Sequence, residues 1–154
     1  MMKKTLVLLA GLAVFGGSAA LAQADFSGQI KARQGQFQIL AINLGILGGM
    51  AKGETPYDAE LAQHAADSLV AVSHIYEPPL WPEGSDNMSL DGTRALPSIW
   101  DERDDFLSKW AALGTAVSGM QEVAATGQEA IGPALGKVGG ACKACHDKHR
   151  APSG

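Results

Sequence analysis

Apolar residues recur at helical spacing in four segments of the chain. The segments cover residues 26–50, 56–76 and 98–125, and a last one runs from Gln128 or Pro133 to Arg150. Apolar residues at every third or fourth position predict amphipathic helices that bury one face, and no segment alternates with the period of a strand. The residues predicted to point inward are Ile30, Phe37, Leu40, Ala41, Leu44 and Leu47 in the first segment, Leu61, Ala65, Leu69, Val72 and Ile75 in the second, Trp100, Phe106, Leu107, Trp110, Leu113, Val117 and Met120 in the third, and Ile131, Leu135, Val138, Cys142 and Cys145 in the fourth.

Residues that start and stop helices flank these segments. Ser27 is the predicted N-cap of the first helix, and Gly53 follows its end. Pro56 is expected in the N-terminal turn of the second helix. Residues 77–97 are rich in Pro, Gly and Asp and predict a long loop, and Gly127 breaks the third helix. Four helices with three connections, one of them long, predict an all-α fold: an antiparallel up-down-up-down four-helix bundle.

The N-terminal residues 1–24 have the order of a secretory signal peptide. Two lysines precede an apolar run over residues 6–15, and Ala-x-Ala patterns follow that fit cleavage at 22/23 or 24/25. A membrane anchor is the alternative, but the run is short and glycines interrupt it. We therefore expect an exported, periplasmic protein whose single domain covers residues 25–154. Removing Lys3 and Lys4 takes the formal charge from −4 to −6, which argues against a nucleic-acid partner.

The two cysteines of the chain lie near its C-terminus in the motif Cys142-x-x-Cys145-His146. A disulfide between them would close a very small loop and stabilise little. A redox pair usually follows a strand, which the sequence does not predict, and a structural zinc ion needs four ligands. On a helix the three side chains project from one face, as two thioether attachments and one iron ligand would require. The motif therefore predicts one covalently bound haem c, with zinc binding and thiol redox chemistry as the alternatives.

Four stretches resemble one family over nearly the whole mature chain. They are "IKARQGQFQIL" at residues 30–40, "KGETPYDAE" at 52–60, "LPSIW" at 96–100 and "CKACHDKHR" at 142–150. Together they make the chain similar to cytochrome c′, the class II c-type cytochromes, which carry haem at the C-terminal end of a four-helix bundle. The resemblance implies that Arg33 and Gln34 contact the haem and that His146 is the axial iron ligand. In ordinary small cytochromes c the motif lies near the N-terminus instead.

The resemblance also implies which residues surround the iron. Phe37 is the distal residue, and because Arg33 lies one helical turn before it, Arg33 is placed to pair with a haem propionate. Arg150 matches a basic residue of the family's proximal pocket, with a solvated cation at a helix end as the alternative. Thr93 and Arg94 lie where the family's loop passes near the haem edge. His149 departs from the family, whose members often carry an aromatic such as Tyr there.

The remaining candidate ligands are interpreted as structural. His64 and His74 are expected on the surface of the second helix. The methionines are expected in packing or in the loop, and the acidic residues of 101–105 at the dipole of a helix N-terminus. The methionines concerned are Met50, Met88 and Met120.

A phenylalanine cannot bind iron, so the sequence predicts a five-coordinate, high-spin haem behind an apolar lid. Such a site favours NO and CO over oxygen, because bound oxygen usually needs a hydrogen-bond donor. The predicted protein binds NO and CO, transfers single electrons with an unknown redox partner protein, and is not an enzyme. A low-spin electron-transfer cytochrome with a hidden sixth ligand is the alternative. The resemblance further implies a homodimer formed through the first two helices.

Overall fold

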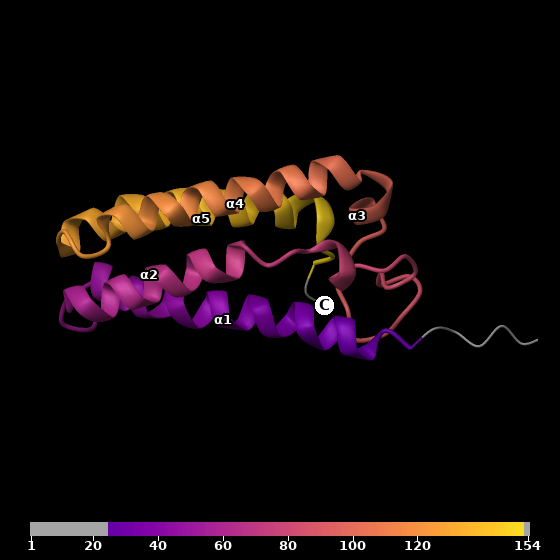
Figure 1. Cartoon of the computed structure of the whole chain (residues 1–154), viewed down its shortest axis with the longest axis horizontal. Coiled ribbons are helices and arrows are strands. Elements are labelled where there is room, and N and C mark those ends of the chain that lie inside the picture. The colour runs from indigo at the N-terminus through magenta and orange to yellow at the C-terminus, as the bar shows by residue number, and fades with distance from the viewer. Residues whose placement is uncertain (1–24, 153–154) are drawn as a thin grey trace, which may run out of the picture.

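A computed structural model of the protein describes residues 25–152, and four long helices make up most of it (Figure 1). The helical elements are α1 (Ser27–Ala51), α2 (Ala59–Ser73), the 3-10 helix η1 (Pro78–Leu80), α3 (Ser98–Asp101), α4 (Arg103–Val123) and α5 (Gln128–His149). Contacts run from α1 to α2, from α2 to α4, from α4 to α5 and from α5 back to α1. This ring of antiparallel neighbours confirms the predicted four-helix bundle. The expected signal peptide and its cleavage sites lie outside the described residues.

The long helices begin and end close to the predicted residues, with local differences. Helix α1 starts at Ser27 with Phe26 in the N-cap position, so the prediction of Ser27 as N-cap was wrong by one residue. The backbone N–H of Ser27 donates to the Asp25 carboxylate at 2.9 Å. Helix α2 begins after Pro56, at Ala59, because the Asp58 carboxylate caps it by accepting the Leu61 N–H at 3.0 Å. Helix α5 starts at Gln128, the earlier of its two predicted starts.

The buried face of α2 differs from the predicted one. Leu61 is 45% exposed and Ile75 is 37% exposed, although both were predicted to point inward. The buried residues of the helix are instead Ala62, Ala65, Ala66, Leu69, Val72 and Ser73. Half of this face is alanine, which lets α2 approach its neighbours closely and leaves larger apolar side chains outside. The apolar stripe is therefore rotated relative to the one drawn through the large residues.

The predicted third helix is two helices in the structure. It breaks at Glu102, whose φ of −124° and ψ of 52° leave the helical region between α3 and α4. Gly127 has a φ of 150° at the start of α5, and a Cβ there would lie 2.6 Å from a Glu129 oxygen. Only glycine adopts this backbone conformation readily, so Gly127 fixes the turn between α4 and α5.

The end of α5 is tied to the long loop between α2 and α3. Leu96 donates its N–H to the His149 carbonyl at 3.0 Å, and Ala151 donates to the Arg94 carbonyl at 2.8 Å. These bonds flank an isolated antiparallel bridge between Ala95 and Arg150. The loop, the start of α1 and the end of α5 therefore meet at one end of the bundle (Figure 1).

No helix within residues 25–152 combines the length and the hydropathy that a membrane span requires.

Candidate haem site

A cavity of about 510 Å³ lies at the end of the bundle where the loop and the end of α5 meet. Its walls come from α1, α4, α5 and the segment of residues 81–99. The lining is predominantly apolar, and every site residue proposed from the sequence is part of it. These residues are Arg33, Gln34, Phe37, Thr93, Arg94, Cys142, Cys145, His146 and Arg150. Segments that are far apart in the sequence thus converge on one space of the size that small-molecule and cofactor sites have.

Cys142 and Cys145 lie on the last turns of α5, and both thiols are free. Burial raises the pKa of Cys145 to about 11, and burial also raises the pKa of Cys142. Both sulfurs are therefore protonated at neutral pH. Thiol redox catalysis and zinc binding both need a thiolate, so the site does not favour either of these alternatives.

His146 follows Cys145 directly and lies in the last turn of α5. Burial lowers the pKa of His146, and the nearby cations Arg150 and Arg94 lower it further. The imidazole is consequently neutral at neutral pH, with one ring nitrogen able to donate its lone pair to a metal.

Phe37 projects into the cavity from α1, within an aromatic wall. Its ring meets the edges of Trp81 at 6.5 Å and Trp110 at 6.1 Å between centroids. Both indole N–H groups bond elsewhere: Trp81 donates to Glu77 at 2.6 Å and Trp110 donates to the Ser73 carbonyl at 3.1 Å. The aromatic wall therefore presents only carbon to the cavity.

Arg33 is buried, at 3% exposed, and its guanidinium is bonded within the protein. It donates to the Ser85 hydroxyl at 2.9 Å and to the Ser85 carbonyl at 3.0 Å, and reaches the Thr93 hydroxyl at 3.5 Å. It also lies 4.4 Å over the Trp81 ring. Gln34 makes a parallel contact, donating to the Gly92 carbonyl at 2.7 Å. These two residues thus attach the loop wall of the cavity to α1.

Sequence reasoning missed several lining residues, of which Trp81 is the most connected. Trp81 lies in the long loop and is 7% exposed, with Phe37, Trp100 and Phe106 packed around it. A tryptophan in a Pro-rich segment is the only local signal that marks it. Gln38 and Lys109 also line the cavity, although no role had been expected for them, and so does Trp110, which had been predicted only to point inward.

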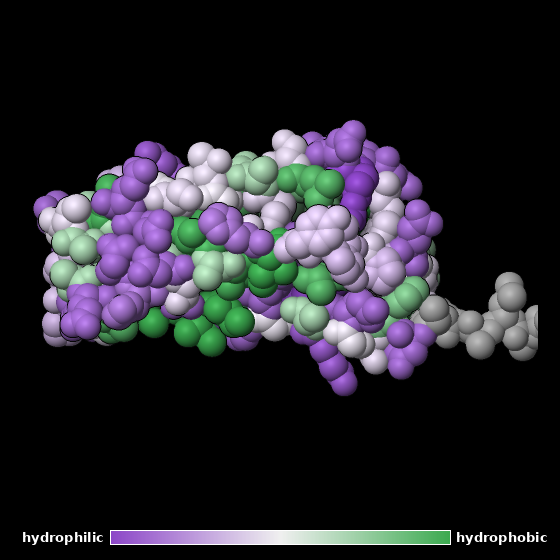
Figure 2. Space-filling model, in the orientation of Figure 1, coloured by the Kyte–Doolittle hydropathy of each residue, from purple (hydrophilic) through white to green (hydrophobic). Residues whose placement is uncertain are grey.

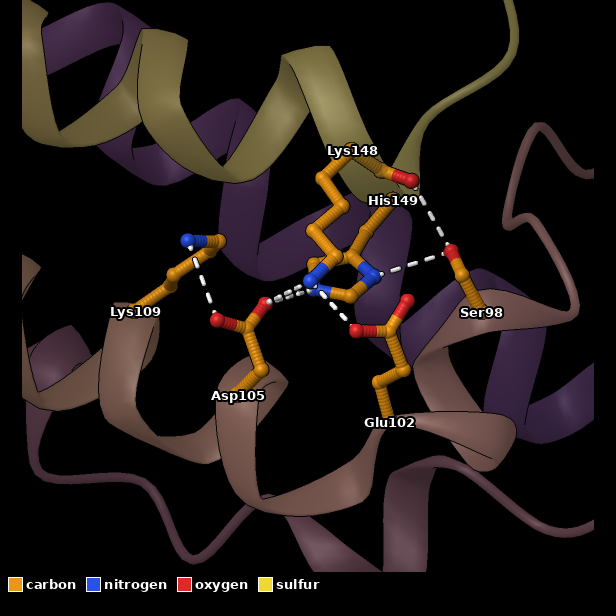
Figure 3. Close-up of polar contacts among 6 residues, drawn as sticks. All are labelled: Ser98, Glu102, Asp105, Lys109, Lys148 and His149. Atoms are coloured by element: carbon orange, nitrogen blue, oxygen red, sulfur yellow. Dashed lines mark hydrogen bonds and ion pairs between the residues drawn. The ribbon is translucent and has the colours of Figure 1, made fainter.

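The acidic residues at the start of α4 do more than complement a helix dipole. Lys148 on α5 pairs with Glu102 and Asp105, and His149 bonds Asp105 as well (Figure 3). Asp104 and Asp105 lie in the first turn of α4, as expected for acidic residues at the dipole of a helix N-terminus, and no side-chain hydrogen bond caps this helix. The carboxylates of Glu102 and Asp105 additionally join the start of α4 to α5.

The predicted roles of the other histidines and methionines can be compared with their burial. His64 on α2 is exposed, as expected, and so is His74, which directly follows the last residue of α2. Met50 and Met120 are buried in the core, and Met88 is 80% exposed.

The sequence model of the family described as "Cytochrome C′" matches residues 28–150. The chain belongs to the cytochrome c′ family. Cytochrome c′ of Cereibacter sphaeroides is 40% identical over 144 residues, which are 94% of this chain and 96% of that protein. Members of this family are c-type haem proteins, so the chain is one as well.

Solved structures of the cytochrome c′ family have the same fold. Cytochrome c′ from Rhodobacter Spheriodes superposes with a TM-score of 0.81 at 38% identity, covering 84% of this chain and 100% of that one. The nitric oxide complex of a cytochrome c prime variant from Alcaligenes xylosoxidans superposes with a TM-score of 0.73 at 27% identity, covering 84% and 98%.

The residues of the cavity fit a covalently bound haem. Its apolar lining suits a porphyrin, and its two neutral thiols on one helix face suit thioether attachment. The neutral imidazole of His146 suits an iron ligand. The side chains of Arg94 and Arg150 are exposed cations at the cavity, which suit the carboxylate edge of a haem.

Proposed function

We propose that this protein holds one haem c through Cys142 and Cys145, with His146 as axial ligand and Phe37 over an open sixth position. Bound there, the haem supplies an iron that takes up diatomic gases and exchanges single electrons. The observation that carries the proposal is the composition of the wall around Phe37. Among the described residues that line the cavity, none is a methionine, and the histidines are His146 and His149.

His149 is not available as a second iron ligand. Its ring nitrogens lie 3.0 Å from the Ser98 hydroxyl and 3.0 Å from the Asp105 carboxylate. It also sits on the same helix as His146, one turn further along. This arrangement supports a five-coordinate, high-spin iron over the low-spin alternative.

The carbon-only aromatic wall supports NO and CO as ligands. Phe37, Leu40 and Ala41 offer no hydrogen bond, and the indole N–H groups of the two neighbouring tryptophans are already bonded. A ligand that gains little from a hydrogen bond is therefore favoured over oxygen. The nitric oxide complex of the Alcaligenes relative supports NO in particular.

We assign the remaining residues to the edges of the haem. Arg33 and Gln34 hold the loop wall and contact the haem, with Thr93 and Arg94 at its edge. Arg150 lies in the proximal pocket, beside His146. The protein transfers electrons to a redox partner protein and acts without catalysing a reaction of its own.

We further propose that the protein is exported to the periplasm and forms a homodimer through α1 and α2. Ile39 and Ile42 on α1 are 47% and 57% exposed, and Leu61 on α2 is 45% exposed. Apolar residues also reach the surface over the part of the molecule that α1 and α2 form (Figure 2). Mass spectrometry of the periplasmic fraction tests export: the mature chain should begin at Gln23 or Asp25.

The visible spectrum of the reduced protein, before and after addition of CO, tests the haem site. We expect broad high-spin bands that shift promptly with CO. Phe37→Met should convert them to sharp six-coordinate, low-spin bands, because the thioether enters the sixth position. Ile39→Met is the matched control, since Ile39 lies on the same helix, is exposed and is not among the cavity-lining residues.

Three outcomes would contradict the proposal at different points. An unchanged spectrum in Phe37→Met would remove Phe37 from the site. Sharp low-spin bands in the unmodified protein that ignore CO would favour the electron-transfer alternative. A purified protein without any haem spectrum would favour the alternatives, zinc binding or thiol redox chemistry at Cys142 and Cys145.

A further inference from the structure

His149 has a buried position at the end of α5, where three helices meet. Its side chain is 2% exposed. Its Nδ1 lies 3.0 Å from the hydroxyl of Ser98 on α3, and its Nε2 lies 3.0 Å from the carboxylate of Asp105 on α4 (Figure 3). The ring edge meets Phe106 at 5.8 Å between centroids. A buried histidine with both ring nitrogens bonded to other helices is a connector rather than a surface residue.

The partners of His149 belong to a wider set of hydrogen bonds. The Ser98 hydroxyl that lies 3.0 Å from Nδ1 also lies 2.8 Å from the Lys148 carbonyl. The Asp105 carboxylate can only accept, so Nε2 donates to it. Ser98 and Asp105 thus hold the ring of His149 from two sides and tie the last turn of α5 to α3 and α4.

Other charged groups surround His149 and Asp105. Lys109 on α4 lies 3.3 Å from Asp105, and Glu102, between α3 and α4, pairs with Lys148 of α5. Lys148 also lies 3.2 Å from Asp105, and Arg150 is the next residue after His149. Burial alone would raise the pKa of Asp105, but hydrogen bonds from His149, Lys148 and Lys109 outweigh it and lower that pKa. Asp105 is therefore an ionised carboxylate that accepts from His149 and pairs with the two neighbouring ammonium groups.

The backbone around His149 carries the two residues placed on the proximal side. The His149 carbonyl accepts the Leu96 N–H at 3.0 Å, and the Arg150 N–H donates to the His146 carbonyl at 3.2 Å. His149 lies one helical turn after His146 and directly before Arg150, where the chain leaves the helix. Fixing the His149 side chain therefore fixes the turn on which His146 and Arg150 stand.

We infer that His149 is a positioning residue: through its bonds to Ser98 and Asp105, it holds the last turn of α5 against α3 and α4 and sets the placement of His146 and Arg150. This role rests on the proposed function in one respect, that His146 binds the haem iron. The bonds of His149 themselves do not depend on haem.

Two measurements on the haem-loaded protein test the inference, with His149→Phe as the central variant. Phenylalanine keeps the packing against Phe106 and deletes both polar bonds. Hydrogen exchange at Leu96 and Ala151, followed in peptides by mass spectrometry, should accelerate about tenfold or more, the loss expected for a hydrogen bond to a charged group. In the reduced protein, the iron–histidine stretching band of the resonance Raman spectrum should shift. His74→Phe, at the exposed histidine that directly follows α2, should change neither quantity.

Two milder variants keep the test decisive if His149→Phe does not fold. Ser98→Ala deletes the hydroxyl that bonds Nδ1 and the Lys148 carbonyl, and Asp105→Asn removes the carboxylate that accepts from Nε2. Each should produce a smaller change of the same kind. Neither should add to the effect of His149→Phe, because the three side chains act as one unit.

The outcomes separate this inference from the proposed function. Exchange that accelerates while the Raman band stays in place would make His149 a structural residue and overturn its positioning role. If neither the hydrogen exchange nor the iron–histidine band changes, His149 does not hold the last turn of α5 and the inference is overturned. A reduced wild-type protein without an iron–histidine band would overturn the proposed function and, with it, the positioning of an iron ligand.

Discussion

Arg33 could serve to pair with haem or to hold the loop against α1. The stability contributed by its contact with Ser85 distinguishes these two roles, and a substitution can measure that contribution. If Arg33 serves only to pair with haem, its link to Ser85 contributes nothing to stability. If Arg33 instead clamps the loop to α1, removing its guanidinium destabilises the fold. Arg33→Met tests this, because methionine keeps much of the apolar length and removes every hydrogen bond.

The size of the effect follows from the contacts that are lost. Arg33 makes two bonds to Ser85, at 2.9 and 3.0 Å, and a hydrogen bond to a charged group contributes about 1.5–3 kcal/mol. The stacking over Trp81 at 4.4 Å adds about 1–2 kcal/mol. Burial of the cation opposes these gains and lowers the pKa of Arg33. We therefore expect Arg33→Met to reduce the free energy of unfolding by about 2–4 kcal/mol.

A double-mutant cycle in urea, followed by far-ultraviolet circular dichroism, measures the contact itself. Ser85→Ala removes the hydroxyl that accepts from Arg33, and the cycle should give a coupling free energy of about 1–2 kcal/mol. Lys31→Met, on an exposed position of the same helix, is the control and should change stability by less than about 0.5 kcal/mol. A coupling free energy below about 0.5 kcal/mol would refute the idea that Arg33 holds the loop against α1, and contact with haem would be its only remaining role.

Three further predictions concern other parts of the molecule. Burial raises the pKa of Glu77 above its ordinary value of 4.5, so the folded protein binds this proton more tightly than the unfolded chain does. The free energy of unfolding of the wild type, measured in urea, should therefore rise relative to that of Glu77→Gln as pH falls from 7 towards 4.5. Equal pH dependence of the two proteins would contradict this. Ile42→Glu should convert a homodimer to monomer in sedimentation experiments, because it buries a charge in the interface, whereas Ala112→Glu on the exposed part of α4 should not; a dimer that survives Ile42→Glu would move the interface away from α1. Replacing Cys142 and Cys145 together by alanine should abolish haem staining after denaturing electrophoresis, and staining that persists would contradict thioether attachment.

Local pattern predicted the residues whose placement depends on helical spacing. Cys142, Cys145 and His146 lie on one helix, so their common direction follows from a period of 3.6 residues. Arg33 and Phe37 share the cavity for the same reason, one turn apart on α1. The bundle itself followed from four periodic segments and the lengths of their connections.

Residues placed by long-range contacts could not be predicted in this way. Trp81 enters the cavity wall because Arg33 and Ser85 hold its loop, and these partners are 52 residues apart. His149 looks like a solvated residue in a charged C-terminal stretch, yet two helices that precede it by more than 40 residues bury it. The stripe of α2 was drawn through the large apolar residues, whereas close packing placed alanines inside.

The hydrophobic core has two separate clusters, and each of the two cysteines packs against a different one. The larger cluster of buried apolar residues includes Leu40 and Leu113, and Cys142 packs against it. The smaller cluster includes Ile99 and Phe106, and Cys145 packs against that one.

All four of these core residues line the cavity, which therefore lies between the two clusters. A haem attached to both sulfurs would contact both clusters and join them into one apolar core, since burial of apolar surface is what stabilises either of them. The covalent bonds that hold the haem would then also bind the loop end of the molecule to the rest of the bundle.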